Sequence, residues 1–564
     1  MNKKIKFSSL LKNASNLTDI FDFYKKNFPT KKFLFSKVKD TWSGKTFQEI
    51  GINIDKIINS LTKLGLKKGD RVFLLSSNRI EWVEFDIAIM SVGGITVPAF
   101  VTNNLDDNAF IIKNSSPKII IFENDNILKK NQAILENFDL SKIITIEKHD
   151  SHINYLSISS EEKKRVKRQN VSLNDISTII YTSGTSGKPK GVTLSHKALI
   201  HNLFASLDII NDFGIDNERF ISFLPLSHSY ERMAGLYFPL LIGGEIYFCS
   251  SLDKLMNEVK EIKPTIFSGV PRLFENIFKK IKSQINKVGF FKRLILNICF
   301  NGLEDNQQNK LKKYLSQIFI FLFLRTTVRK IFGGKVKALI SGGAALSPQI
   351  GLFFNKIGLT LLQGYGQTEA APLISCNTKK FNNPNTVGFP VKNVEIKIAV
   401  DGEILVKGSN VMNGYWRSKK LTSQTIKKEW LYTGDLGFLD KMGRLVINGR
   451  KKDLIVTSGG DNISVQKIET KLSEQVEIEQ AVVFGDNKPF LIALLVVQDS
   501  SNKSKYTELI KKINTSLNSL ERIRKFLLLK EKFTYENGFL TQTHKIKRER
   551  VYLSYKDEIE KLYK

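Results

Sequence analysis

The chain has 564 residues, 42% of them hydrophobic and 25% charged. It is therefore long enough for two or more domains and too apolar for global disorder. The net charge of +31 suits an anionic membrane surface or polyanionic substrates, but a general bias in composition explains the spread-out lysines equally well. Because no nucleic-acid module accompanies this charge, we expect no nucleic-acid partner.

Neither secretion nor membrane spanning is expected. Residues 1–12 are basic but lack the apolar core and cleavage site of a signal peptide. The nearest approach to a membrane span, the apolar run at residues 318–324, is about half a span and precedes Arg325 and Arg329. The three cysteines have no metal-type spacing and fit a reducing compartment. We expect a cytoplasmic protein, with peripheral contact at the inner face of the cell membrane as a hypothesis.

Between residues 40 and 450, short β-branched runs alternate with helical patterns. Helices are expected at residues 50–64 and 82–92, and strands at 71–75, 118–122, 177–181 and 336–340. This alternation predicts an α/β fold, with layered and mostly parallel sheets in a large N-terminal domain.

The later part of the chain has a different pattern. Strand-like pieces with Gly and Asn turns at about 392–447 predict a small β-rich subdomain. The polar residues 449–453 are a plausible hinge, followed by β pieces at 480–484 and 491–497 and a helix at 506–520. We expect an N-terminal domain over 1–448, the hinge, and a small mobile α+β domain over 454–564.

Residues 181–192 read Tyr-Thr-Ser-Gly-Thr-Ser-Gly-Lys-Pro-Lys-Gly-Val and follow an apolar strand end. Glycines let backbone amides approach an anion, while hydroxyls and lysines add donors and positive charge, which suits a polyphosphate. The loop is not a Walker A loop, because Thr182 stands where glycine is needed. A flexible surface loop is the alternative for this segment alone. The candidate ligands are Thr182, Ser183, Gly184, Thr185, Ser186, Gly187 and Lys190.

Two small-residue motifs follow later in the chain. Residues 342–345, Gly-Gly-Ala-Ala, come after a predicted strand and leave room for a flat ring such as adenine. Residues 363–370 read Gln-Gly-Tyr-Gly-Gln-Thr-Glu-Ala. There Tyr365 can stack on a purine, Thr368 can bond a phosphate oxygen and Glu369 can bind Mg²⁺.

A third motif, residues 430–437, places Asp435 on a glycine-flanked loop, where its carboxylate can accept hydrogen bonds from two ribose hydroxyls. Arg450 then supplies a guanidinium for the same ribose or a phosphate. Each of these motifs alone is also compatible with a simple turn.

Together and in this order, the motifs resemble those of the adenylate-forming superfamily, which includes acyl-CoA synthetases, luciferases and nonribosomal adenylation domains. The resemblance covers about residues 40–552. It implies that Thr185 and Glu369 bind Mg²⁺, that Thr368 serves the phosphates and that Lys452 is the hinge residue. The implied ATP- and AMP-binding residues are those of the loop at 182–190 with Gly343, Ala344, Gln363, Gly364, Tyr365, Gly366, Thr368, Asp435 and Arg450.

The family also has a lysine near the C-terminus that reaches the acyl carboxylate and the α-phosphate. Residues 540–548 match this segment and Lys545 aligns with that lysine, although His544 replaces a common glycine and Lys547 lies two residues away. Residues 457–463 resemble the segment that lines the pantetheine tunnel of CoA after domain rotation. The implied CoA-binding residues are Ser458, Gly459 and Gly460.

Residues 224–232, Leu-Pro-Leu-Ser-His-Ser-Tyr-Glu-Arg, resemble the form found in long-chain acyl-CoA synthetases, which implies that His228 faces the acyl carboxylate. Residues 270–275 and the segment 278–335 also resemble that subgroup. The implied reaction joins a long-chain fatty acid to AMP from ATP and then to CoA, releasing AMP and pyrophosphate, with Lys545, His228, Thr185 and Glu369 as catalytic residues. A fatty acyl-AMP ligase that loads an acyl carrier protein and a retired lipid- or nucleotide-binding protein are the alternatives. The oligomeric state stays open, with a homodimer among the options.

Overall fold

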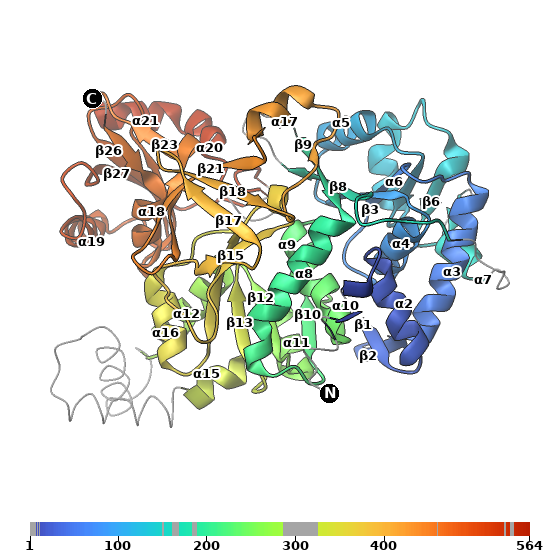
Figure 1. Cartoon of the computed structure of the whole chain (residues 1–564). Helices are drawn as coiled ribbons and strands as arrows, with labels where there is room; N and C mark the ends of the chain where they lie inside the picture. Colours follow the sequence, from blue (N-terminus) through green and yellow to red (C-terminus); the bar gives the residue numbers. More distant parts are fainter. Residues whose placement is uncertain are drawn as a thin grey trace.

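The computed structural model shows layered sheets and helices, with the C-terminal part at one end of the molecule (Figure 1). It describes residues 7, 9–10, 12–148, 152–160, 168–182, 189–285, 325–459, 461–534, 537–541 and 546–564. Expectations that fall on other residues lie outside the described part of the chain.

The first layer is an eight-stranded sheet. Neighbouring strands from β8 to β7 are parallel, while β9 is antiparallel to both β8 and β19. Because helices cover a parallel sheet on both faces, its strands are apolar along their whole length, which explains why they are visible as β-branched runs. In spatial order the strands are β19 (Gly414–Tyr415), β9 (Lys190–Ser195), β8 (Ile176–Thr182), β4 (Ile95–Ala99), β3 (Arg71–Leu75), β5 (Ile119–Phe122), β6 (Ile143–Thr145) and β7 (Ile153–Asn154).

Helices between these strands confirm the predicted α/β alternation, with shifted ends. The helix expected at 50–64 begins at Phe47, because Thr46 caps it and Glu49 closes the capping box. The helices of this region are α2 (Thr18–Asn27), α3 (Phe47–Lys63), α4 (Ile80–Ser91), α5 (Leu105–Ser115), α6 (Asp125–Asn131), α7 (Tyr155–Ser160) and α8 (His196–Ile210). The short 3₁₀ turns are η1 (Gln132–Ile134), η2 (Leu140–Lys142) and η3 (Asn211–Phe213).

Two further sheets form the middle of the molecule. One is a five-stranded sheet whose first three strands are parallel, in the order β12 (Ile266–Gly269), β13 (Ala338–Ser341), β14 (Leu361–Gly366), β15 (Leu373–Cys376) and β16 (Phe389–Pro390). The other has four strands in the order β10 (Arg219–Ser222), β11 (Glu245–Phe248), β1 (Lys32–Val38) and β2 (Thr41–Thr46). Apolar residues of α8 join the same core as those of the first sheet.

The helices of this middle region are mostly short. One of them, η4, has π geometry and continues α9 into α10. They are α9 (Ser229–Glu231), η4 (Arg232–Tyr237), α10 (Phe238–Ile242), α11 (Leu255–Ile262), α12 (Pro271–Ile285), α15 (Arg325–Ile331), α16 (Pro348–Lys356) and the 3₁₀ turn η6 (Thr368–Ala370).

An antiparallel sheet follows where the sequence predicts β-rich structure. Its strands are β17 (Val394–Ile398), β18 (Glu403–Gly408), β21 (Trp430–Leu439) and β20 (Ile426–Lys427), with β22 (Leu445–Arg450) paired to β21 and α17 (Lys419–Thr425) before β20. The 3₁₀ turn η7 (Lys451–Asp453) then leads out of this sheet.

The C-terminal part has apolar cores of its own. The helix expected at 506–520 spans Lys503–Asn514, because Asn502 caps its start. The elements of this part are β23 (Leu454–Val456), β24 (Asn462–Ser464), α18 (Val465–Ser473), β25 (Ile478–Phe484), β26 (Leu491–Val497), α19 (Lys503–Asn514), β27 (Ile523–Leu529), α20 (Arg548–Ser554) and α21 (Lys556–Tyr563).

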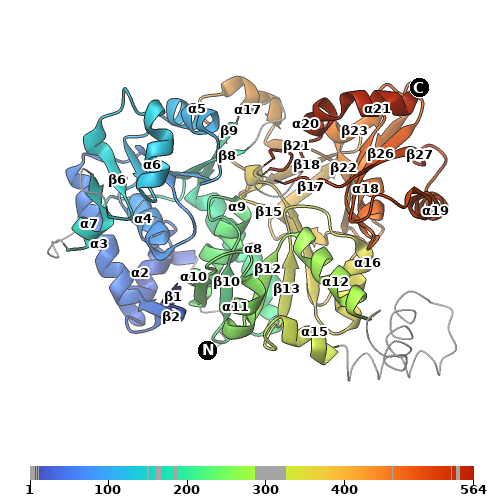
Figure 2. The same ribbon diagram turned by 180° about the vertical axis from the view of Figure 1, so that it is seen from behind.

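Seen from behind, α18 lies next to α12 and α16 of the middle region (Figure 2). Two hydrogen bonds join the middle region to the C-terminal part here, one from α12 to the start of β25 and one from the residue before α16 to the residue after α18. Lys279 Nζ donates to the Ile478 carbonyl oxygen at 2.8 Å, and the Ser347 hydroxyl donates to Glu474. Within the described ranges, no helix combines the length and the apolar run that crossing a bilayer requires.

Candidate active site

A cavity of about 2460 Å³ lies where the middle sheets, the antiparallel sheet and the C-terminal part meet. Its wall includes most of the described residues that the sequence predicts for a nucleotide. These are Thr182, Lys190, His228, Gly343, Ala344, Gln363, Gly364, Tyr365, Gly366, Thr368, Glu369, Asp435, Arg450 and Lys452.

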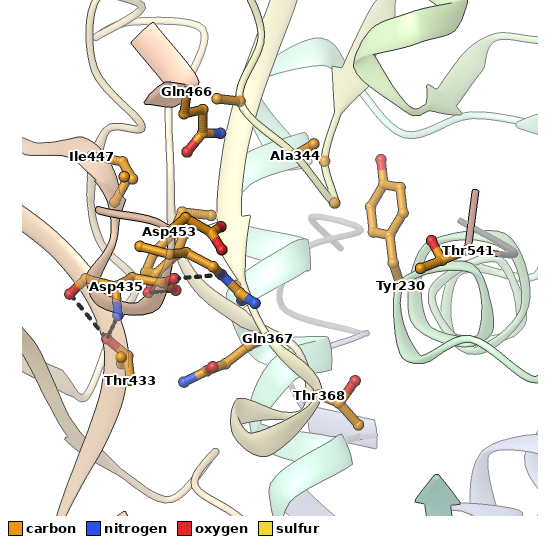
Figure 3. A pocket seen from close by; sticks show the side chains of 18 of the residues that line it. Tyr230, Ala344, Gln367, Thr368, Thr433, Asp435, Ile447, Asp453, Gln466 and Thr541 are labelled. Atoms are coloured by element: carbon orange, nitrogen blue, oxygen red, sulfur yellow. Dashed lines mark hydrogen bonds and ion pairs between the residues drawn. The ribbon is translucent and has the colours of Figure 1, made fainter. Parts of the chain in front are cut away.

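Two side chains hold the carboxylate of Asp435 in this wall. The Tyr365 hydroxyl donates to its Oδ2 at 2.7 Å, and Arg450 Nε donates to its Oδ1 at 2.8 Å. Asp435 and Arg450 are register partners on the antiparallel strands β21 and β22, so the β-hairpin itself brings the pair together. The backbone N–H of Asp435 donates to the Thr433 hydroxyl at 3.1 Å, as drawn in Figure 3.

The three side chains form one charge-assisted network. The Asp435 carboxylate raises the pKa of Arg450, and burial raises the pKa of Tyr365 far above its ordinary value. Tyr365 therefore stays protonated and donates. An ionised carboxylate held by two donors is fixed in orientation, and its remaining lone pairs can accept ribose hydroxyls.

Small residues make a flat recess at the end of β13. Gly343 has a φ of +84°, which a residue with a side chain rarely adopts. A Cβ atom added to Gly342 would lie 3.0 Å from the ring of Tyr230, so this aromatic ring already covers one side of the recess. Figure 3 shows Tyr230, Ala344 and Thr541 along the cavity wall. The recess has the shape that a purine needs.

Tyr230 was not predicted as a site residue, although it stands in the motif at residues 224–232. Its hydroxyl donates to the Ile340 carbonyl oxygen at 3.2 Å, which ties α9 to the end of β13. The signal in the sequence that could have indicated Tyr230 as a site residue is its aromatic side chain two positions after His228.

The predicted phosphate loop joins two paired strands. Thr182, the last residue of β8, is the register partner of Lys190, the first residue of β9, and both line the cavity. The remaining loop candidates Ser183, Gly184, Thr185, Ser186 and Gly187 lie outside the described residues, as do Gly460 and Lys545.

Thr368 and Glu369 occupy η6, which contacts the strand β9. The Thr368 and Ser229 hydroxyls are hydrogen-bonded at 3.1 Å, and Glu369 Oε1 accepts the Tyr415 hydroxyl at 2.9 Å. Gly366 just before them is required by space, because a Cβ atom there would lie 2.0 Å from the Pro372 carbonyl oxygen.

His228 caps the start of α9, where its Nδ1 accepts the Tyr230 backbone N–H at 3.2 Å, and it also lines the cavity. The acyl carboxylate role predicted for it stays a prediction.

The last two residues of the motif, Glu231 and Arg232, are buried and do not line the cavity. Arg232 is paired with Asp86, donates to the Thr178 hydroxyl at 2.7 Å, and lies over the ring of Trp82 at 5.2 Å.

At the predicted hinge, Lys452 lines the cavity and the preceding Lys451 is bound to the antiparallel sheet. Lys451 Nζ donates to Asp401 at 2.5 Å and to Glu403 at 3.1 Å. Ser458 and Gly459 are exposed and, of the described residues, do not contribute to the cavity wall. Thr541 and Ile546, on either side of the segment with Lys545, do line it.

Fold and site thus define a two-part α/β protein whose large cavity carries a recess and braced carboxylate suited to a nucleoside. The family profile described as "AMP-binding enzyme" matches residues 21–416, and "AMP-binding enzyme C-terminal domain" matches residues 452–564. The chain belongs to the AMP-binding enzyme family.

Named relatives extend over almost the whole chain. A long-chain-fatty-acid–CoA ligase, FadD15 of Mycobacterium tuberculosis, is 30% identical over 568 residues, covering 93% of both chains. Fatty acyl-CoA synthetase A of Dictyostelium discoideum is 27% identical, covering 92% of this chain and 85% of its own.

Solved structures confirm the fold class. The adenylation domain of a carboxylate reductase from Mycobacterium chelonae has a TM-score of 0.81 at 18% identity, covering 99% of this chain and 93% of its own. The anthranilate CoA ligase AuaEII in complex with anthranoyl-AMP has a TM-score of 0.77 at 20% identity, covering 96% and 97%.

Proposed function

We propose that this enzyme is an ATP-dependent long-chain fatty acid–CoA ligase. In the first step a carboxylate oxygen of the acid attacks the α-phosphorus of ATP, forming an acyl-adenylate as pyrophosphate leaves. In the second step the CoA thiolate attacks the acyl carbon, forming a thioester as AMP leaves. The named relatives support both the ligase class and the long-chain acid.

The observation that carries this proposal is the two-ended character of the cavity. One end holds the ribose-type network of Asp435, Tyr365 and Arg450. The other end is apolar and lies between α8, η4 and α10, and its wall includes Ile209, Ile210, Phe220, Met233, Ala234, Phe238 and Ile266. A hydrocarbon tail gains free energy in such a lining, about 0.8 kcal/mol for each buried methylene group. A single cavity can therefore hold an adenylate and an aliphatic tail together.

His228 and Tyr230 come from the element between these two ends. Both line the cavity, and Tyr230 contacts the adenine-type recess. The reacting carboxylate is therefore expected beside α9. The reaction brings two anions together, so positioned cations and amide donors matter more than a nucleophilic side chain. In this proposal, Lys190, Lys545 and the loop residues Ser183, Gly184, Thr185, Ser186 and Gly187 supply that charge and those donors.

The residues present fit a magnesium–nucleotide complex. Mg²⁺ favours one or two carboxylates together with substrate phosphates over a cage made only of protein ligands. Glu369 offers a hard carboxylate on η6, which contacts the strand β9. The described residues include no cluster of three or more His, Cys, Asp or Glu side chains suited to a metal. Glu369 and Thr185 would hold the ion, which would neutralise charge on the phosphates.

For the second step, we propose that the C-terminal part rotates about Lys452 and brings Ser458, Gly459 and Gly460 to the cavity as the entry for CoA. Thr541 and Ile546 line the cavity in the arrangement seen here, which is the arrangement expected for adenylation with Lys545 at the site. Rotation would exchange one segment for the other.

We also propose that the enzyme takes its acid from an anionic membrane surface. The described flanks of the long segment, α12 and α15, carry Lys280, Lys282, Arg325, Arg329 and Lys330. Cationic flanks beside apolar residues favour anionic headgroups. Co-sedimentation with phosphatidylglycerol vesicles tests this, with phosphatidylcholine vesicles as the control. Equal binding to both, or to neither, contradicts it.

Product analysis tests the proposed reaction. Incubation with ATP, Mg²⁺, palmitate and CoA should give palmitoyl-CoA and AMP by mass spectrometry, and the Lys545→Ala variant should lose both products. Acyl-adenylate without thioester would indicate an acyl-AMP ligase that loads a carrier protein. No turnover of palmitate or of other fatty acids would overturn the proposal.

A further inference from the structure

Tyr415 lies between Lys190, at the end of the predicted phosphate loop, and Glu369, the predicted metal-binding carboxylate. Its hydroxyl donates to Glu369 Oε1 at 2.9 Å, and Lys190 Nζ lies 5.4 Å from the centre of its ring. One side chain therefore contacts groups from two predicted ATP-binding motifs.

The backbone of β19 fixes this side chain firmly. Tyr415 pairs with Val192 of β9, and its N–H donates to the Thr422 hydroxyl at 2.9 Å. The neighbouring Gly414 accepts the Thr193 hydroxyl at 2.7 Å, and its φ of +136° favours glycine. Since the Tyr415 side chain is also buried, its ring has little freedom to turn away from Glu369.

Glu369 is held by the same segment through its backbone. The Met412 N–H donates to the Glu369 carbonyl oxygen at 2.9 Å. Residues 412–415 thus hold both the main chain and one carboxylate oxygen of Glu369.

We propose that Tyr415 is a positioning residue for the metal–nucleotide complex. It holds Glu369 by Oε1 so that the carboxylate presents Oε2 to the metal, and its ring seats Lys190 beside the triphosphate through a cation–π contact. This inference rests on the proposed function, in which Glu369 binds Mg²⁺ together with ATP.

Hydrogen bonds to charged groups contribute enough free energy for a measurable effect. Without the Tyr415 hydroxyl, the Glu369 side chain loses this hydrogen bond and has to be fixed in one conformation when the metal binds, which costs free energy. In the wild type, Mg²⁺ should raise the affinity for ATP above its value in EDTA. We therefore expect this increase to be about tenfold smaller in the Tyr415→Phe variant. Phenylalanine keeps the ring and the contact with Lys190, so ATP affinity in EDTA should stay unchanged.

Equilibrium dialysis with radiolabelled ATP, in the absence of fatty acid, measures both affinities without turnover. Each protein is titrated once in Mg²⁺ and once in EDTA. Tyr247→Phe is the matched control, because its hydroxyl also donates to a carboxylate, Glu245, at 2.8 Å, and because it is similarly buried. It stands on β11 and does not line the cavity, so its variant should behave like the wild type.

A second pair of variants guards against a folding defect. Glu369→Gln should remove most of the Mg²⁺ effect, and adding Tyr415→Phe to it should change nothing further. An equal loss of affinity in Mg²⁺ and EDTA, or no loss in either, would overturn the positioning role. A wild type whose ATP affinity does not depend on Mg²⁺ would also overturn it, whereas palmitoyl-CoA formation tests the proposed function separately.

Discussion

Glu231 stands directly after Tyr230 in α9, and its side chain is completely buried. Its Oε1 accepts the Ser222 hydroxyl at 2.7 Å, while its Oε2 has no hydrogen-bond partner within the part of the chain that is described. Burial raises the pKa of this carboxyl group from 4.5 to about 8. A glutamate is thus kept largely protonated at neutral pH beside the proposed acyl site.

This shift makes folding stability dependent on pH. The folded state binds the proton more tightly than the unfolded state, so the carboxyl group lowers the free energy of unfolding as the pH rises from 4.5 to 8. A shift of about 3.5 pH units corresponds to roughly 5 kcal/mol over the whole window. Above pH 8 no further change is expected from this group.

The Glu231→Gln variant keeps the shape and removes the titration. Its melting temperature, measured by differential scanning fluorimetry at pH 5, 6, 7, 8 and 9, should exceed that of the wild type by an amount that grows to several degrees by pH 8 and then levels. Glu49→Gln is the matched control. Thr46 donors lower the pKa of Glu49, so Glu49 titrates at lower pH than Glu231 and its difference from the wild type should change little between pH 6 and 9. A Glu231→Gln difference that is constant or shrinks with pH would refute the reasoning.

Three further predictions concern other parts of the structure. Arg232→Met leaves Asp86 buried without its cation and should cost about 3–5 kcal/mol of stability, measured by urea unfolding; a change below 1 kcal/mol would contradict the buried pair. Gly366→Ala places a Cβ atom 2.0 Å from a carbonyl oxygen, so ATP affinity by dialysis should fall at least about tenfold, and an unchanged affinity would mean that the turn relaxes freely. Lys279→Met removes a hydrogen bond to the C-terminal part. ATP–pyrophosphate exchange, which measures adenylation, should slow several-fold. Thioester formation from added acyl-adenylate, which measures the second step, should not slow. An equal effect on both steps would exclude a contact that is specific to one conformation.

Local sequence signals predicted much of the fold. The strand expected at 71–75 has those bounds, because its buried residues 72–75 form a continuous apolar run, as a strand covered on both faces requires. The helix expected at 50–64 was placed three residues late at its start, although the spacing of Thr46 and Glu49 is a capping-box signal that the sequence already carries. The strand β19 was missed entirely, since two residues are too few to show a period.

The candidate site was predicted as separate motifs and not as an assembly. Asp435 and Arg450 were expected near the same ribose, and the register of their hairpin explains why they meet. The bond between Glu369 and Tyr415 and the pair of Asp86 and Arg232 join residues far apart in the chain, so no local pattern could reveal them. These partners depend on how strands pack, which a single sequence does not specify.

The strand β19 is synthesised long after its partner β9, which leaves the edge of β9 unpaired in the nascent chain. Gly414 follows Ser195, the end of β9, by 219 residues, so a ribosome adding about 5–20 residues per second needs roughly 10 to 45 s between the two. During that interval the outer edge of β9 lacks its native partner, and unpaired edges can pair with other chains. The same two residues bring Tyr415 to Glu369, so the edge is covered and the proposed phosphate site is completed in one event. A nascent chain released before residue 415 would therefore be incomplete as a catalyst and also prone to aggregation.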